Sequence, residues 1–176
     1  ENIGALRNEQ RALLANFIAQ VRAGFDSIVS FNWDTLIEIA AAASSLKTSN
    51  DGTGAALSLI KPHGSLDLVE LTEDRWEEIR SSSNAIKLNV VARYEIGSRK
   101  HVLLRCEDPA SVADRIDGVF GDALLVAPNR RKEYLSPWIR DQWKIALRLI
   151  READEIRIIG FSFPEADVRP QLALNW

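Results

Sequence analysis

The stretch "DSIVSFNWDTLIEIA", Asp26 to Ala40, decides the fold that we expect, because it joins a short apolar run to a run of helix formers. "DSIVSF" is apolar and contains β-branched residues, which favours a buried strand. "DTLIEIAAAASSL", which starts at Asp34, is rich in residues that stabilise helices. Asn32 and Asp34 therefore lie at a strand-to-helix junction, with Trp33 between them.

The same alternation recurs along the chain. Apolar residues spaced by three and four between Leu13 and Val21 predict a helix, which Gly24 ends. The segment "SPWIRDQWKIALRLIREA" predicts an amphipathic helix with Ser136 as its cap and Pro137 at its first position. Further apolar runs predict strands at "ALSLI", "DALLVAP" and "EIRIIGFSF", residues 56–60, 122–128 and 155–163.

Strands that alternate with helices are typical of βαβ units. We therefore predict an α/β, Rossmann-like fold with a mostly parallel sheet and helices on both faces. Residues 1–176 are expected to form a single domain, with 70–121 as an insertion or subdomain of uncertain order. Within that segment, residues 73–80 favour a short helix, and 86–96 and 101–107 favour strands.

Composition limits the classes of function. The 176 residues are 46% hydrophobic and 27% charged, as in an ordinary globular domain, and the formal charge of -3 gives no overall basic field to attract nucleic acid. No apolar run approaches the roughly 20 residues that span a bilayer. The single cysteine, Cys106, excludes an internal disulfide and a Cys-rich zinc module, so we expect a cytoplasmic protein without zinc. The chain contains no methionine, and we expect it to be a fragment.

Polar residues follow three of the predicted strands, where open parallel sheets bind ligands. After the first strand come Asn32 and Asp34, which could bind a ligand. Alternatively, they simply satisfy helix amides, and Thr35 and Glu38 have the spacing of a capping box. Both interpretations can hold together.

After the second strand, "KPHGS" places His63 on a turn, between a proline and a glycine. A neutral imidazole there could act as a general base near pH 7, or could simply bond within the turn. After the last strand, Gly160 would let a ligand approach the backbone and Ser162 would offer a hydroxyl. The alternative for this segment is an ordinary strand-turn-helix with Ser162 and Glu165 as a capping box.

Together and in this order, the three motifs resemble the sirtuin superfamily, in particular the divergent bacterial sirtuin-like domains that hydrolyse NAD in anti-phage defence. "SFNWDTLIE" is similar to the family's Asn-x-Asp strand end, and "KPHGSLD" to its His-Gly element. The segment from "APNRRKEY" to "GFSFPEAD" is similar to its closing helix and Gly-x-Ser strand. The segment 70–121 lies outside the resemblance.

The resemblance implies roles for individual residues. Asn32 matches the catalytic asparagine, Asp34 the aspartate near the nicotinamide ribose, and His63 the base that acts on the ribose. The cofactor-binding positions that it implies are Phe31, Asn32, Asp34, Gly64, Gly160, Phe161 and Ser162. The implied reaction is hydrolysis of NAD, as substrate, to nicotinamide and ADP-ribose.

Two departures from the family pattern shape this expectation. No Gly-rich phosphate-binding loop precedes Asn32 in this sequence. We therefore expect that this loop either lies upstream of Glu1 or has been lost, together with its binding of the phosphates. Cys106 alone cannot build the four-cysteine zinc module of deacetylating sirtuins, which argues for NAD cleavage or binding. The alternative is a non-catalytic sensor or interaction module that binds NAD or an ADP-ribose derivative. The resemblance also implies control by a fused sensor domain or through a homo-oligomer.

Overall fold

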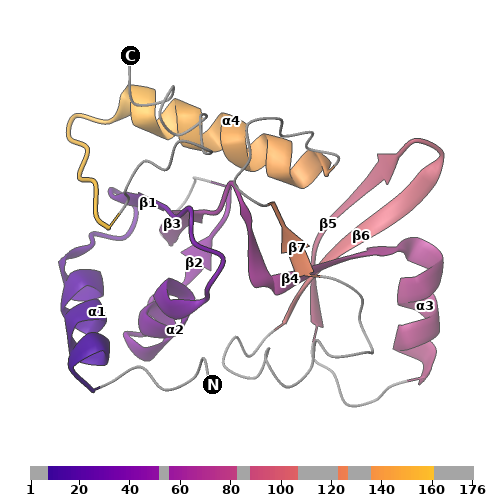
Figure 1. Cartoon of the computed structure of the whole chain (residues 1–176), viewed down its shortest axis with the longest axis horizontal. Coiled ribbons are helices and arrows are strands. Elements are labelled where there is room, and N and C mark those ends of the chain that lie inside the picture. The colour runs from indigo at the N-terminus through magenta and orange to yellow at the C-terminus, as the bar shows by residue number, and fades with distance from the viewer. Residues whose placement is uncertain (1–7, 52–55, 83–87, 107–122, 127–135, 161–176) are drawn as a thin grey trace.

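The computed structural model describes residues 8–51, 56–82, 88–106, 123–126 and 136–160, which form two sheets and four helices (Figure 1). The helices are α1 (Asn8–Gln20), α2 (Leu36–Ala43), α3 (Glu73–Ser82) and α4 (Pro137–Glu152). The strands are β1 (Ser27–Val29), β2 (Thr48–Ser49), β3 (Leu57–Ile60), β4 (Gly64–Thr72), β5 (Leu88–Ile96), β6 (Arg99–Cys106) and β7 (Ala123–Leu125). Among these residues no helix is long and apolar enough to cross a membrane.

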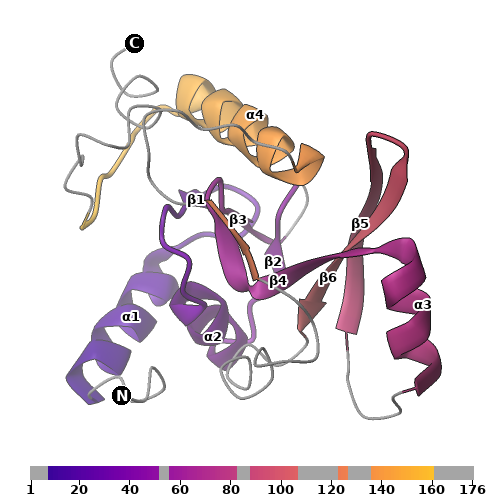
Figure 2. The same cartoon turned by 45° about the vertical axis from the view of Figure 1, so that its right-hand side comes forward.

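The first sheet, called sheet A here, has three parallel strands in the order β1-β3-β2. Its central strand, β3, is buried along its whole length, as expected for a short parallel strand covered on both faces. Helices α1 and α2 cover one face through a core that contains Ile18, Ala41 and Leu57. Helix α4 lies on the opposite side of the sheet (Figure 2).

The second sheet, sheet B, has four antiparallel strands in the order β5-β6-β4-β7. The prediction of a mostly parallel, Rossmann-like sheet is therefore wrong, because only sheet A is parallel. The physical reason is the turn at residues 61–63, after which the chain enters β4 with no helix between β3 and β4, and β4 pairs antiparallel with β6. Antiparallel pairs need only short connections, such as the one between β5 and β6.

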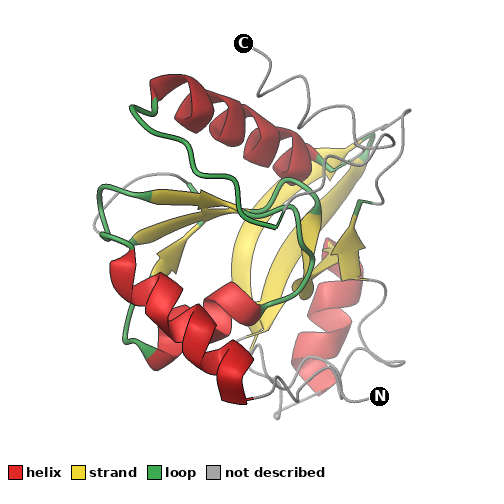
Figure 3. Cartoon of the chain, turned by 60° about the vertical axis from the view of Figure 1, so that its left-hand side comes forward, coloured by secondary structure: helices red, strands yellow, loops and turns green. Residues whose placement is uncertain are grey.

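Helices cover both faces of sheet B. On one face, Trp138, Ile139 and Trp143 of α4 pack against Leu68 and Leu103. The other face packs against α3 through Ile79 and the half-buried Trp76, with the strand residues Val69, Leu71, Val102 and Leu104. Trp76, Trp138 and Trp143 therefore pack against the two faces of sheet B, and α4 lies above both sheets (Figure 3).

The helix and strand predictions for the middle segment are confirmed by α3, β5 and β6. The start of α4 at Pro137 is also as predicted, with Ser136 in the cap position, but the Ser136 side chain makes no capping hydrogen bond. Its hydroxyl lies 3.1 Å from the Tyr94 hydroxyl instead. Tertiary contact with β5 thus replaces local capping.

The predicted strand at 155–163 is wrong for its described part. Residues 153–160 form no strand and are exposed, including Ile156, Ile158 and Ile159. The β-branched composition of this segment favours a strand, yet a strand also needs a partner edge and a covered face. Residues 161–163 lie outside the described part of the chain.

Candidate functional site

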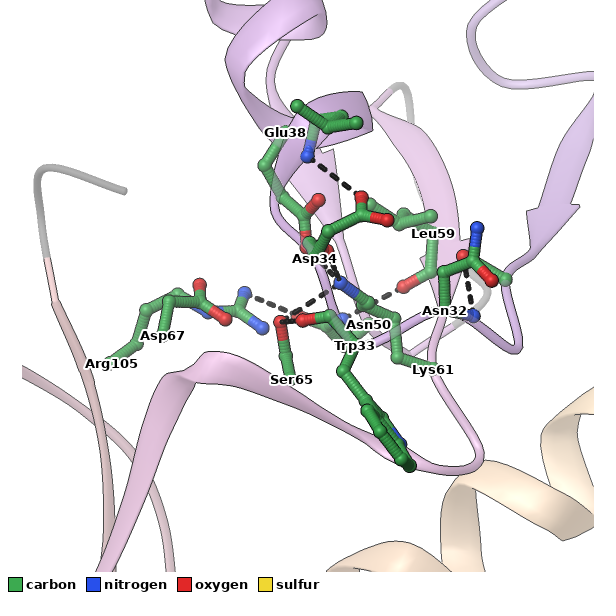
Figure 4. A network of polar contacts seen from close by, with 12 residues as sticks. Asn32, Trp33, Asp34, Glu38, Asn50, Leu59, Lys61, Ser65, Asp67 and Arg105 are labelled. Atoms are coloured by element: carbon green, nitrogen blue, oxygen red, sulfur yellow. Dashed lines mark hydrogen bonds and ion pairs between the residues drawn. The ribbon is translucent and has the colours of Figure 1, made fainter. Parts of the chain in front are cut away.

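The parallel pairing of sheet A brings three segments to one edge. Val29 pairs with Ile60, and Ser49 pairs with Ser58, so the carboxyl ends of β1, β2 and β3 lie together. Beyond β1 the Ser30 amide still donates to the carbonyl of Ile60 at 2.8 Å. The candidate site is therefore the carboxyl edge of sheet A, formed by residues 30–34, 50–51 and 61–65 (Figure 4).

In the segment after β1, Asn32 and Asp34 have different surroundings. The Asn32 side chain is exposed, and its backbone amide donates to Ser30 Oγ at 3.4 Å. Asp34 Oδ1 accepts a hydrogen bond from the Leu36 amide at 3.1 Å, at the start of α2. Asp34 therefore satisfies a helix amide, while the Asn32 side chain faces solvent at the edge.

The capping box expected from Thr35 and Glu38 does not form. Thr35 occupies the cap position of α2 but its side chain makes no capping hydrogen bond. The Glu38 carboxylate turns into the interior, where it pairs with Lys61. The side chain of Asp34, and not that of Thr35, accepts a hydrogen bond from a backbone amide at the start of α2.

His63 lies on the turn between β3 and β4, as predicted, but it is only 1% exposed. Its ring centroid lies 5.4 Å from that of Phe31 and 5.7 Å from that of Trp143. The backbone carbonyl of His63 accepts from the Val126 amide at 2.9 Å, which links the turn to the end of β7. The imidazole is thus enclosed by aromatic rings, one of them from the residue beside Asn32.

The two glycines named from the sequence differ in their surroundings. Gly64 has a φ of +84°, and a Cβ there would lie 1.8 Å from the carbonyl oxygen of Leu124, so only glycine lets β7 approach β4. Gly160 has a φ of +67°, and no atom of the described residues lies within 4 Å of its Cβ position. Phe161 and Ser162 lie outside the described residues.

A buried lysine is the centre of the polar contacts beneath the site. The Lys61 ammonium donates to Glu38 Oε1 at 3.0 Å, to Ser65 Oγ at 2.9 Å and to the backbone carbonyl of Asp34 (Figure 4). Lys61 is 1% exposed and Glu38 is 7% exposed. An ion pair this deeply buried needs the added hydrogen bonds to offset its desolvation.

Burial also acts on the protonation of Glu38. Loss of water raises the pKa of this carboxyl above its usual 4.5, and the nearby negative charge of Asp67 raises it further. The ammonium of Lys61 acts in the opposite direction, but its effect is smaller than that of burial. The ion pair with Lys61 alone would lower the pKa of Glu38. Burial has the larger effect because the carboxylate has little contact with water, so the pKa is raised.

Asn50, at the end of β2, connects this cluster to sheet B and α4. Its side-chain Nδ2 donates to the Leu59 carbonyl at 2.7 Å, and its side-chain Oδ1 accepts from Arg105 Nη1 at 2.6 Å. Gln142 of α4 donates to the Asn50 carbonyl at 2.9 Å and accepts from the Lys61 amide at 3.1 Å. One asparagine thus bonds to residues of sheet A, sheet B and a helix.

Arg105 and Asp67 extend the cluster within sheet B. Arg105 Nε lies 3.0 Å from Asp67 Oδ2, an ion pair by distance. The contact lacks hydrogen-bond geometry, and within the described part of the chain neither Asp67 oxygen has a hydrogen-bond partner. The two groups therefore compensate each other by charge, without a directional bond.

Sequence reasoning missed the structural roles of Lys61, Glu38, Asn50 and Gln142. A signal was present for two of them: Lys61 directly follows the apolar run of β3, and Glu38 interrupts an otherwise apolar run in α2. The contacts of Asn50 and Gln142 span up to 92 positions, and no local pattern reveals them.

The described residues contain no group of three or more histidine, cysteine or acidic side chains that could hold a metal ion. Comparison of the chain with protein-family models, with curated proteins and with solved structures gave no match.

Proposed function

We propose that the carboxyl edge of sheet A binds NAD and hydrolyses its nicotinamide-ribose bond, releasing nicotinamide and ADP-ribose. The observation that carries the proposal is the parallel pairing of β1 with β3, which brings Asn32 and His63 to one edge. The sirtuin-like order of these motifs in the sequence supports it, and suggests NAD as the ligand.

Few groups are needed for this chemistry. Nicotinamide leaves NAD as a neutral molecule from a cationic ring, so its departure needs no general acid. The protein must hold the ribose, favour the positive charge that develops on it and admit water. In the proposed reaction the exposed Asn32 amide orients the ribose and the attacking water, Asp34 supplies negative charge, and His63 accepts a ribose hydroxyl proton.

The test is release of nicotinamide from NAD by the full-length protein, with Asn32→Ala and His63→Ala beside the wild type. Loss of one group that positions substrate or transfers a proton is expected to lower kcat about 10²-fold or more. Asn89→Ala is the matched control for Asn32, because Asn89 is an exposed asparagine on β5. Wild-type activity in both site variants would refute the proposal.

A second candidate is a module that binds NAD or an ADP-ribose derivative without cleaving it. The burial of His63 between Phe31 and Trp143 favours this candidate, because a base must reach the proton that it accepts. It predicts saturable NAD binding in calorimetry, weakened by Asn32→Ala, without nicotinamide release by the full-length protein.

A further inference from the structure

Lys61 is the least expected residue of the interior, since it is a cation at 1% exposure. Burying a charge costs several kcal/mol before pairing, so an apolar residue would serve the core at least as well. We propose that Lys61 is a positioning residue of the NAD reaction, which holds the segment from Asn32 to Asp34 in its working conformation. This inference rests on the proposed function.

The argument starts from the backbone of that segment. Two successive carbonyls, those of Trp33 and Asp34, point inward and are bonded by groups outside the segment. The Trp33 carbonyl accepts from the Leu66 amide at 2.9 Å and from Ser65 Oγ at 3.4 Å. The Asp34 carbonyl accepts from the Lys61 ammonium. Hydrogen bonds from Leu66, Ser65 and Lys61 thus fix both carbonyls on the interior side, and the side chain of Asn32 remains exposed at the edge.

An ammonium suits this position for a geometric reason. It carries three donors, and the three acceptors around it are the Asp34 carbonyl, Glu38 Oε1 and Ser65 Oγ. These acceptors belong to the site segment, to α2 and to β4, so one side chain ties the segment to two elements. The planar guanidinium of an arginine has a different donor geometry and would not reproduce the three bonds.

Glu38 completes the arrangement as the counter-ion. Its carboxylate compensates the charge of Lys61, which lets a lysine be buried here. Replacing both by apolar residues of similar size removes the charge pair without leaving a lone buried ion. Such exchanges are often neutral for stability, so they separate positioning from folding.

The experiment compares the full-length wild type with Lys61→Met/Glu38→Leu and with Lys100→Met, an exposed lysine of β6 that serves as the control. We expect the double variant to keep its melting temperature but to lose about 10²-fold in kcat for nicotinamide release, with KM changed by less than about threefold. Amide hydrogen exchange at residues 32–36 is expected to accelerate in the double variant and not in the control.

The outcomes separate the two proposals. If the wild type releases nicotinamide and the folded double variant has the same kcat, the positioning role of Lys61 is overturned while the proposed function stands. If the wild type neither cleaves nor binds NAD, the proposed function fails and the role of Lys61 in it fails too. Should the double variant not fold, Lys61→Arg provides the same comparison, and an unchanged kcat there also overturns the inference.

Discussion

At the scale of single residues, Gly64 shows how closely the start of β4 approaches β7. Gly64→Ala is expected to lower the free energy of unfolding by about 2 to 5 kcal/mol, because the φ of +84° is strained for alanine and the new Cβ meets the Leu124 carbonyl. Gly97→Ala, at a φ of +62° and with no atom of the described residues within 4 Å of the new Cβ, carries the strain alone and should cost about 1 to 2 kcal/mol. Urea unfolding measures both, and equal losses would contradict the close contact at Gly64.

Glu38 gives a prediction of pH dependence. Because burial raises its pKa in the folded chain, the folded state binds this proton more tightly than the unfolded state. The stabilising contribution of the proton is present in full below the unfolded pKa and is lost as the pH rises through the folded pKa.

The wild type should therefore lose stability relative to Glu38→Gln as the pH increases from about 4 towards neutrality. Urea unfolding of both proteins at a series of pH values between these limits checks the prediction. A wild type that gains stability over the variant across this range would show that attraction to Lys61 outweighs burial.

At the scale of secondary structure, local pattern predicted the elements better than it predicted their partners. The strand at β1, the apolar run of β3 and the helix α4 follow directly from composition and spacing. The antiparallel sheet B does not: residues 64–72, which form β4, are not among the predicted strands. Which strand lies beside it depends on the turn at 61–63 and on contacts that are distant in sequence.

The segment 155–160 shows the other limit of local pattern. Its isoleucines have the composition of a buried strand, yet Ile158 is 52% exposed, whereas Ile139 of α4 is fully buried. We expect Ile139→Ala to cost about 2 to 5 kcal/mol through loss of core packing, and Ile158→Ala to change stability by less than about 0.5 kcal/mol. Thermal and urea unfolding measure both variants. A comparable loss for Ile158→Ala would mean that this segment is packed.

The candidate site was predictable only in part. The strand-end positions of Asn32 and His63 follow from the alternation of apolar and polar runs. The enclosure of His63 by Phe31 and Trp143 does not, because Trp143 belongs to a helix 80 positions further along the chain. Neither does the support from Lys61 and Asn50, whose partners are assembled only by the complete fold.

At the scale of the whole molecule, Asn50 connects sheet A, sheet B and α4 by hydrogen bonds, so its substitution should lower the stability of the whole fold. Asn50→Ala removes the hydrogen bond to the Leu59 carbonyl and the one to the Arg105 guanidinium, which keeps its ion pair with Asp67. A hydrogen bond contributes about 0.5 to 1.5 kcal/mol and one to a charged group about 1.5 to 3 kcal/mol, so a loss of about 2 to 4 kcal/mol is expected.

The measurement is urea unfolding followed by circular dichroism and by tryptophan fluorescence, with Asn89→Ala as the exposed control. The two probes should report one shared transition at a lower urea concentration. If Asn50→Ala unfolds at the same urea concentration as the control, the hydrogen bonds of Asn50 do not stabilise the contact between the two sheets.

The strand order β1-β3-β2 also has a consequence for how the chain assembles. Within the described part of the chain, β1 and β2 each pair with β3 and with no other strand, although both precede β3 in the sequence. Neither strand therefore finds its backbone partner until the last of the three inserts between them. Sheet A and the edge that carries the candidate site therefore cannot form before β3 is in place, so substitutions in β3 are expected to slow folding more than equally destabilising ones in β1.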